Sequence, residues 1–309
     1  MPSGAYTQLD QLLQTRFVAQ SLSLFPKRRG RSLLAGNERT HFRGRGMDFE
    51  EVRLYQAGDD IRSIDWRVTA RTQVTHTKVY REERERPVLI LVDQRSPLFF
   101  GSRNCFKSVL AAEIATTLAW AALGRGDRIG GLVLGDQDQR DIKARRSKHS
   151  VLELVHQIHD YNRKLNSPVG NLRNDNINPL INDARRIAKP GSAVFIISDF
   201  HDLTEKDNAS VYQLTRHTDV SFLRVFDPLE ESLISSNHLS VSNGSQQILL
   251  PTNERKFQQA FHQQFVDKQQ RLQDLSQSMG IALLNFSTAD DFNSSMQSYF
   301  SDSPAGRRI

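Results

Sequence analysis

Five short, continuous apolar segments alternate with longer amphipathic segments over the last two thirds of the chain. The apolar segments span residues 88–92, 129–134, 193–197, 220–226 and 281–286. Continuous apolar runs of this length are typical of parallel strands buried on both faces, because a half-buried strand would alternate apolar and polar residues. The segments between them, such as 106–121 and 151–158, repeat apolar residues at helical spacing. This alternation predicts an α/β fold with a doubly wound, mostly parallel sheet.

The other segments divide the chain further. We expect three regions: an N-terminal region (residues 1–86), an α/β domain (87–300) and a flexible tail (301–309). Apolar residues at helical spacing predict an amphipathic helix at 5–22. Within the α/β domain, residues 239–250 predict a hairpin, because Asn243-Gly244 favours the positive φ angles of a tight turn. A Gln-rich helix is expected at 253–278.

Positive charge is concentrated in the N-terminal region. Residues 1–86 hold 16 Lys and Arg against 11 Asp and Glu, which is most of the net charge of +6. The densest cluster is Lys27, Arg28, Arg29 and Arg31. Such a cluster can bind anionic lipid, nucleic acid or an acidic partner, and a solvated basic loop is the alternative.

The cysteine content and the hydropathy of the chain indicate where in the cell the protein is located. Cys105 is the only cysteine, so no intrachain disulfide can form, which favours the reducing cytoplasm. No stretch approaches the 18 or so apolar residues of a membrane span, so we expect no transmembrane segment.

Acidic and basic side chains are closely spaced in residues 43–71, a segment that we name the strap. Its charged residues include Asp59, Asp60, Arg62, Asp65, Arg67 and Arg71, with Ile61, Ile64 and Trp66 between them. Carboxylates interleaved with apolar anchors can be buried only when a guanidinium partner is available. We therefore interpret the strap as a segment that packs on the α/β domain, with Trp66 as an apolar anchor. A docking surface for a partner protein is the alternative.

The strap resembles the signature of a bacterial family known as domain of unknown function 58. The matching positions are Arg53, Tyr55, Gly58, Asp59, Asp60, Arg62, Ile64, Asp65, Trp66, Ala70 and Arg71. The resemblance continues at Asp93, at 197–200 and at 227–230. It implies a domain like von Willebrand factor A (vWA) after the strap. It also implies a MoxR-type AAA+ ATPase as partner, with membrane-bound vWA proteins as further candidates.

Three acids follow predicted strands: Asp93, Asp199 and Asp227. In an open α/β sheet, ligands bind beyond the carboxyl ends of the strands. At this place the resemblance implies a metal-ion-dependent adhesion site, built from an Asp-x-Ser-x-Ser loop, a distant Thr and a distant Asp. Such hard oxygen ligands suit Mg²⁺.

The candidate metal loop departs from that pattern. It reads Asp93-Gln94-Arg95-Ser96-Pro97, so Arg95 and Pro97 stand at the two serine positions, and Asp175 best matches the threonine. A guanidinium about 5 Å from a divalent ion is repelled by roughly 6–7 kcal/mol at an effective dielectric constant of about 20. We expect Arg95 to replace the cation and to pair with Asp93, Asp199 or Asp175. The alternatives are a solvent-pointing Arg95 beside a metal site that uses Asp93, Ser96 and Asp199, and an unrelated placement of Arg95.

Sequence motifs for catalysis are missing. The chain has no Gly-x-Ser-x-Gly turn, no phosphate loop and no second histidine at ligand spacing from His201. We predict a non-catalytic cytoplasmic adaptor without a cofactor, which acts with a MoxR-type ATPase in protein remodelling or complex assembly. Its partner-binding face would comprise Asp93, Arg95, Ser96, Asp175, Asp199 and Asp227.

Two other functions and one other location stay open. One alternative function is a Mg²⁺-dependent hydrolase or phosphotransfer enzyme that uses Asp93, Asp175 and Asp199. The other is a binder of anionic surfaces that works through the basic segment at 27–31. Peripheral association with the inner membrane is the alternative to a purely cytoplasmic location.

Overall fold

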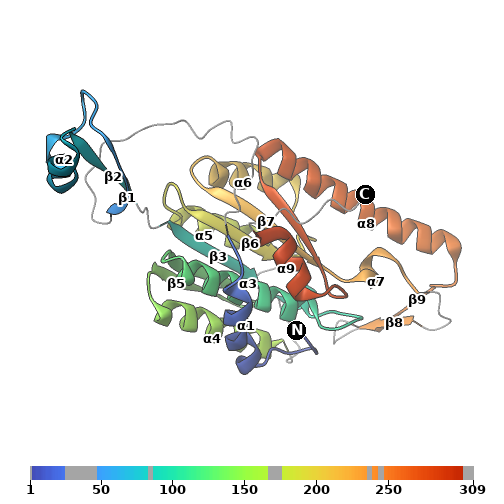
Figure 1. Ribbon diagram of the computed structural model, residues 1–309. Coiled ribbons are helices and arrows are strands. Elements are labelled where there is room, and N and C mark those ends of the chain that lie inside the picture. Colours follow the sequence, from blue (N-terminus) through green and yellow to red (C-terminus); the bar gives the residue numbers. More distant parts are fainter. Residues whose placement is uncertain are drawn as a thin grey trace. The chain divides into compact units, whose positions relative to one another are not determined.

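The computed structural model describes residues 2–24, 47–82, 86–165, 176–234, 239–242 and 247–301. The chain divides into two compact units. The α/β unit comprises Met1–Lys27 and Arg86–Ile309, and the small unit comprises Arg28–Glu85. Figure 1 shows the elements of each unit in the colours of the sequence.

A six-stranded sheet forms the centre of the α/β unit, within the described residues. Its strands are β3 (Pro87–Asp93), β4 (Arg128–Leu134), β5 (Gln139–Arg145), β6 (Ala193–Ser198), β7 (Asp219–Phe226) and β10 (Ala282–Ser287). The strand order is β10-β7-β6-β3-β4-β5, and neighbouring strands are parallel except β5, which is antiparallel to β4. The five apolar segments of the sequence are the parallel strands, so the predicted fold class is confirmed.

The edge strand β5 was not predicted from the sequence. Its segment QRDIKAR buries only Ile142. An edge strand pairs on one side only, and polar residues along it protect the sheet from pairing with other chains. Its sequence therefore lacks the apolar run that marks the other strands.

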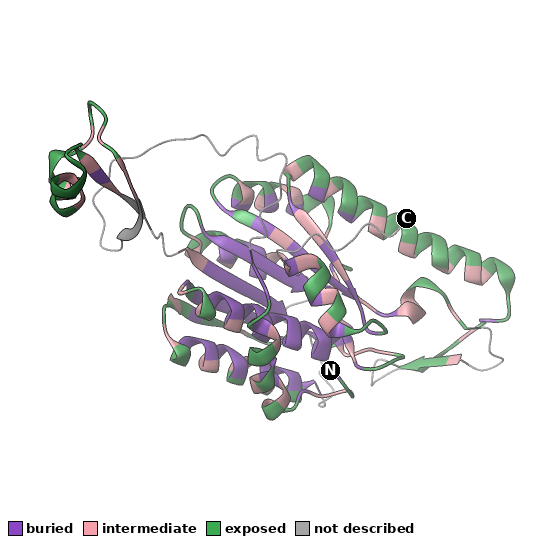
Figure 2. Ribbon diagram, in the orientation of Figure 1, coloured by how far each residue is buried: buried purple, intermediate pink, exposed green. Residues whose placement is uncertain are grey.

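Helices cover both faces of the sheet (Figures 1 and 2). One apolar layer holds α1 (Leu9–Ala19), α3 (Lys107–Gly124), α4 (Lys148–Lys164) and α9 (Phe292–Phe300). The opposite layer holds α5 (Asn178–Ile187), α6 (Asn208–Thr215) and α8 (Arg255–Met279). Figure 2 shows the central strands β3, β4 and β6 and helix α3 almost entirely in the colour of buried residues. Because α3 contacts the sheet, α1 and α4, it is apolar around most of its circumference.

The N-terminal helix belongs to the α/β unit rather than to the strap. α1 contacts α3 and α4, and Leu12 at their interface is 1% exposed. This grouping differs from the expected N-terminal region, residues 1–86, because the apolar face of α1 is buried against helices far along the chain. Sequence proximity placed α1 with the strap, whereas packing places it with the sheet.

Shorter elements complete the described residues. The small unit contains the antiparallel strands β1 (Met47–Leu54) and β2 (His76–Glu82), with the 3₁₀ helix η1 (Ile61–Ser63) and α2 (Trp66–Thr72) between them. In the α/β unit, η2 (Ser96–Leu98) follows β3, η3 (Glu205–Asp207) precedes α6, and α7 (Pro228–Glu231) follows β7. β8 (Leu239–Ser242) and β9 (Gln247–Leu250) pair as the predicted hairpin, and its turn at Asn243-Gly244 lies outside the described residues. None of the described helices combines the length and the apolar character that a membrane crossing requires.

Candidate functional site

The parallel arrangement of β3, β6 and β7 brings their carboxyl ends to one edge of the sheet. Asp93, Asp199 and Asp227 therefore lie at the same edge, as the strand pattern predicts. Asp93 and Asp227 are fully buried, and the side chain of Asp199 is 6% exposed. Carboxylates this deeply buried need a cation or several donors close by.

Arg95 is the direct partner of Asp93. Its Nε donates to Asp93 Oδ1 at 2.9 Å, and its Nη2 donates to Asp93 Oδ2 at 2.7 Å. Its Nη1 donates to Asp202 Oδ2 at 2.7 Å, and Ser198 Oγ donates to Asp93 Oδ2 at 2.8 Å. Burial by itself would lower the pKa of Arg95, but the hydrogen bonds and charges of Asp93 and Asp202 outweigh it and raise that pKa. The guanidinium is a permanent cation with 1% exposure.

The oxygens around Asp93 do not fit a Mg²⁺ ion. Both carboxylate oxygens of Asp93 already accept hydrogen bonds from Arg95, and the hydroxyl of Ser96 is bound to Asp136. Among the described residues, no group of three or more His, Cys, Asp or Glu side chains could hold a metal ion. Asp175, the expected match to the threonine ligand, lies outside the described residues. A divalent ion here would have to displace a buried, doubly bonded guanidinium.

Lys107 neutralises the second acid. Its Nζ donates to Asp199 Oδ2 at 2.7 Å and to Glu230 Oε1 at 2.6 Å, and its side chain is 2% exposed. Burial would lower the pKa of Lys107, but the two carboxylates raise it. Burial would likewise raise the pKa of Asp199, but Lys107 and then His201 hold it well below its usual range. We name Asp93, Arg95, Lys107, Asp199, Asp202 and Glu230 the strand-end cluster.

The loop after β6 folds back onto the strand-end cluster. Phe200 has a φ of 53°, a left-handed conformation that costs a non-glycine residue about 1–2 kcal/mol. Its ring is buried and lies 4.7 Å from that of Phe222, which offsets the cost. The turn brings His201 Nδ1 to 2.8 Å from Asp199 Oδ1. Burial would lower the pKa of His201, but Asp199 outweighs it and raises that pKa.

Asp227 is a structural cap. Its carboxylate accepts from the backbone N–H and the hydroxyl of Ser102, from Thr288 Oγ1 and from the N–H of Leu229 at the start of α7. Burial would raise the pKa of Asp227, but these donors, Ser102 first, lower it. With four donors from the chain itself, Asp227 contributes to the loop geometry and has no cation partner among the described residues.

Sequence reasoning missed Lys107 and Arg224. Lys107 begins an otherwise apolar helix, and Arg224 lies inside the apolar strand segment 220–226. A charge inside a run that must be buried is the signal that could have identified both residues. The partners of Lys107 could not be read from the sequence, since its Nζ meets an acid 92 residues away.

The strap acids cap turns and helices. Asp65 Oδ1 accepts from the N–H groups of Arg67 and Val68 at the start of α2, and its other oxygen lies 3.6 Å from Lys78 Nζ. Asp60 caps η1, and Asp59 pairs with Arg53 at 2.7 Å. Among the described residues, Asp65 therefore forms no ion pair with a strap arginine, because its carboxylate caps the adjacent helix and faces Lys78. The packing of the strap against the α/β unit stays a prediction.

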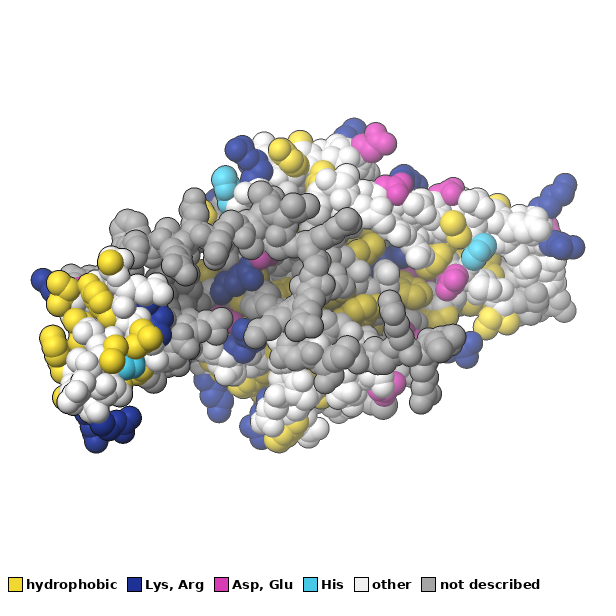
Figure 3. All heavy atoms as spheres, turned by 45° about the horizontal axis from the view of Figure 1, so that its top comes forward, with side chains coloured by type: hydrophobic (Ala, Val, Ile, Leu, Met, Phe, Trp, Pro, Cys, Tyr) yellow, Lys and Arg dark blue, Asp and Glu magenta, His cyan; other side chains and the backbone are white. Residues whose placement is uncertain are grey.

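The surface of the small unit carries apolar and basic side chains together (Figure 3). Trp66 is 67% exposed and Ile61 is 66% exposed, so neither is an apolar anchor within this unit. Arg62, Arg67 and Arg71 are exposed and have no ion pair with any described residue.

We expect Asp65→Ala to weaken α2 locally. The variant removes the N-cap acceptor of the Arg67 and Val68 N–H groups, so amide hydrogen exchange in α2 should become faster. Asp65→Asn keeps an acceptor and is the matched control, with exchange close to that of the unchanged protein. Equal exchange rates in the alanine variant and the unchanged protein would contradict the capping role.

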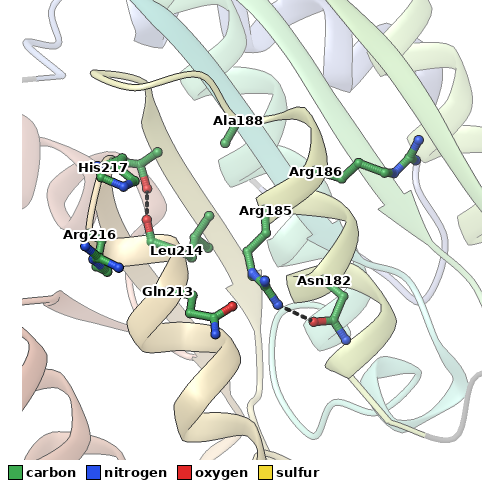
Figure 4. Close-up of a pocket in the computed structure, with 9 residues that line it drawn as sticks. Asn182, Arg185, Arg186, Ala188, Gln213, Leu214, Arg216 and His217 are labelled. Carbon is green, nitrogen blue, oxygen red and sulfur yellow. Dashed lines mark hydrogen bonds between the residues drawn. The ribbon is translucent and has the colours of Figure 1, made fainter.

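A basic hollow lies at the opposite edge of the sheet (Figure 4). It has a volume of about 450 Å³ and is lined by the ends of α5 and α6. Arg185, Arg186, Arg216 and His217 surround it, and all four are exposed. Arg185 bonds Asn182, and Arg186 pairs with Asp183. This hollow is separate from the strand-end cluster, because Thr218 in its wall precedes the first residue of β7.

The fold and the strand-end cluster define an α/β protein whose strand-end carboxylates are neutralised by its own arginine and lysine. Residues 51–271 match the family described as "Protein of unknown function DUF58". The match covers more than half of the chain, so the protein belongs to this family. The resemblance seen in the strap is confirmed.

Uncharacterized proteins of Mycobacterium bovis and of Mycobacterium tuberculosis are relatives of this chain. They are 31% identical over 184 residues, which is 59% of this chain and 56% of each relative. The match therefore spans little more than half of the length of these relatives.

Solved structures with similar folds were also found. An aerotolerance-related membrane protein from Bacteroides fragilis, with multiple mutations to serines, is 16% identical, with 69% of this chain and 96% of that chain covered and a TM-score of 0.43. The conserved hypothetical protein BatB from Bacteroides thetaiotaomicron is 15% identical, with 69% and 95% covered and a TM-score of 0.41. A von Willebrand factor type A protein from Catenulispora acidiphila is 12% identical, with 73% and 43% covered and a TM-score of 0.39.

Proposed function

We propose that this protein is a non-catalytic adaptor in the cytoplasm. It binds a MoxR-type AAA+ ATPase through the strand-end edge of the α/β unit and acts with it in protein remodelling or complex assembly. One observation carries the proposal: Asp93, for which the family resemblance implies the ion site of a vWA domain, has both carboxylate oxygens bonded to Arg95. The resemblance of the strap to its family supplies the identity of the partner.

The pairing of the strand-end cluster supports binding over catalysis. A general base or metal ligand must turn a free carboxylate oxygen toward its substrate or ion. Asp93 is held by Arg95 and Asp199 by Lys107, so the hydrolase alternative would require both pairs to open. Burial raises the pKa of Cys105 to about 12, which leaves its thiol protonated and a poor nucleophile. The basic segment at 27–31, on which the anionic-surface alternative depends, lies outside the described residues.

A pull-down with a MoxR-type ATPase from the same organism tests the proposal. The ATPase is held in its ATP-like, ADP and nucleotide-free states, because a remodelling partner should bind one state more tightly. We expect retention that is strongest in one state, and no ATP hydrolysis by this protein alone. A folded protein that is retained in none of the states would remove the support for the adaptor.

Surface variants locate the interface. Arg95 is buried, so charge reversal there would test folding rather than binding. Arg103 is exposed in the loop that contacts Asp227, and Arg103→Glu should weaken the complex by about 1 kcal/mol or more, roughly fivefold. Arg216→Glu, at the opposite edge, is the matched control and should bind normally. If Arg216→Glu weakens the complex and Arg103→Glu does not, the interface lies at the basic hollow instead.

A further inference from the structure

Arg224 on β7 is a buried cation that has no ion-pair partner among the described residues. The residue is 6% exposed, and its guanidinium makes no hydrogen bond or ion pair with any described residue. It differs in this from Arg95 and Lys107, which are at least as buried and each bind two carboxylates. Burying an unpaired guanidinium is costly, so this arrangement needs a reason.

The guanidinium of Arg224 lies between aromatic rings at the wall of a hollow. Its Cζ is 4.7 Å from the centre of the Phe265 ring and 5.5 Å from that of Phe226. These contacts supply cation–π attraction but accept none of its N–H groups. The hollow has a volume of about 170 Å³ and lies between the carboxyl end of β7 and α8, with Phe261, Phe265 and Lys268 on its α8 side.

The two acids that line this hollow are already engaged. Asp199 is bound by Lys107 and His201, and Glu230 is bound by Lys107 and by the N–H of Asp227. Burial lowers the pKa of Arg224, and the charges of Glu230, Asp199 and Glu231 only partly oppose this effect. None of the described residues therefore accepts a hydrogen bond from Arg224, while the exposed Lys268 adds a second positive charge at the rim.

A neighbouring side chain is also unsatisfied. Asn285 on β10 is the register partner of Arg224, so both side chains project from the same face of the sheet. The Asn285 Oδ1 atom is buried and accepts no hydrogen bond from any described residue. Two adjacent strands thus present polar groups that lack partners at the same level of the sheet.

We propose that the hollow beside Arg224 is a binding site for a carboxylate group attached to an apolar or aromatic group. The fork of a guanidinium matches the two oxygens of a carboxylate, and the phenylalanine rings match an apolar substituent. A doubly charged phosphate is a poorer ligand, because Asp199 and Glu230 repel a second negative charge. The carboxylate comes from a small organic acid or from the C-terminus of a protein partner. The site goes beyond the ATPase proposal and does not depend on it.

Calorimetry on the full chain tests this site with benzoate as the probe. We expect benzoate to bind at least tenfold more tightly than benzamide, which has the same ring without the charge, and than inorganic phosphate. Two versions of a short peptide that ends in phenylalanine, one with a free C-terminal carboxylate and one with a C-terminal amide, distinguish a protein C-terminus from a small organic acid. Tighter binding of the free-acid peptide than of benzoate assigns the site to a protein C-terminus, and the opposite order assigns it to a small acid. No benzoate or peptide binding tighter than about 10 mM would overturn the proposal.

Two variants separate binding from folding. Arg224→Met keeps the length and apolar contacts of the side chain but removes its donors, so benzoate binding should fall at least tenfold. The melting temperature should not fall, because the buried unpaired charge is also removed. Lys268→Met is the control at the rim and should weaken benzoate less than threefold. A destabilised Arg224→Met protein that still binds benzoate would show that Arg224 is structural and would contradict the proposal.

Discussion

Lys107→Met should cause a large loss of stability. The variant leaves Asp199 and Glu230 without their shared cation, and the side chain of Asp199 is only 6% exposed. Breaking a buried ion pair by removing one partner costs roughly 3–5 kcal/mol. For a chain of this size we expect the melting temperature to fall by about 10 °C. Circular dichroism during heating measures the change.

The pH dependence of this effect has a definite sign. Lys107 lowers the pKa of Asp199, so the pair contributes stability above the ordinary pKa of an aspartate, about 3.9, and loses it as the pH falls through the lowered value. Asp199 and Glu230 raise the pKa of Lys107, so its contribution is full below about 10.4 and is lost only at higher pH. In the variant, Asp199 protonates more readily. The deficit in melting temperature should therefore be smaller at pH 4 than at pH 8.

An exposed lysine and a second substitution provide the controls for Lys107→Met. Lys206→Met makes the same chemical change on the surface and should leave the melting temperature nearly unchanged. Lys107→Met/Asp199→Asn should recover some of the loss, because one stranded charge is removed together with its partner. A Lys107→Met protein as stable as the unchanged one would contradict the pairing.

Arg95→Met should destabilise the protein to a similar extent. It leaves Asp93 and Asp202 without a cation, and Asp93 is fully buried. The expected cost is again roughly 3–5 kcal/mol. Arg103→Met, at an exposed arginine of a nearby loop, is the control and should have little effect. Arg95→Met/Asp93→Asn should be more stable than Arg95→Met alone.

Metal titration tests the same pair by a different measurement. We expect the unchanged protein to bind Mg²⁺ or Mn²⁺ no more tightly than about 1 mM, because the guanidinium of Arg95 repels a divalent ion. Arg95→Ser removes the repulsion and adds an oxygen ligand, so calorimetry should show tighter binding of the metal ion. If no ion binds, the variant should be less stable, because Asp93 and Asp202 have lost their cation. Micromolar binding to the unchanged protein that Asp93→Ala abolishes would revive the Mg²⁺-dependent enzyme.

The predictions made from patterns within single segments agree well with the fold. The apolar runs of β3, β4, β6, β7 and β10 identify a sheet buried on both faces, since such runs can avoid water in no other way. The partners of the strap carboxylates could not be read from the sequence, because a carboxylate can serve either a distant cation or the next helix terminus. Asp65 serves the helix terminus. Sequence spacing does not distinguish these two uses.

The amino-acid sequence by itself determined the class of fold, the order of the parallel strands along the chain, the family, and the presence of Asp93 and Asp199 at strand ends. Only the tertiary structure determined which charged residues form ion pairs with one another. Lys107 reaches Asp199 and Glu230, 92 and 123 positions away, and Arg95 reaches Asp202 across 107 positions. The physical reason is that hydrophobic burial depends on local patterns of apolar residues, whereas ion pairing depends on distances of a few ångströms, and those distances exist only once the strands are aligned and the helices are packed.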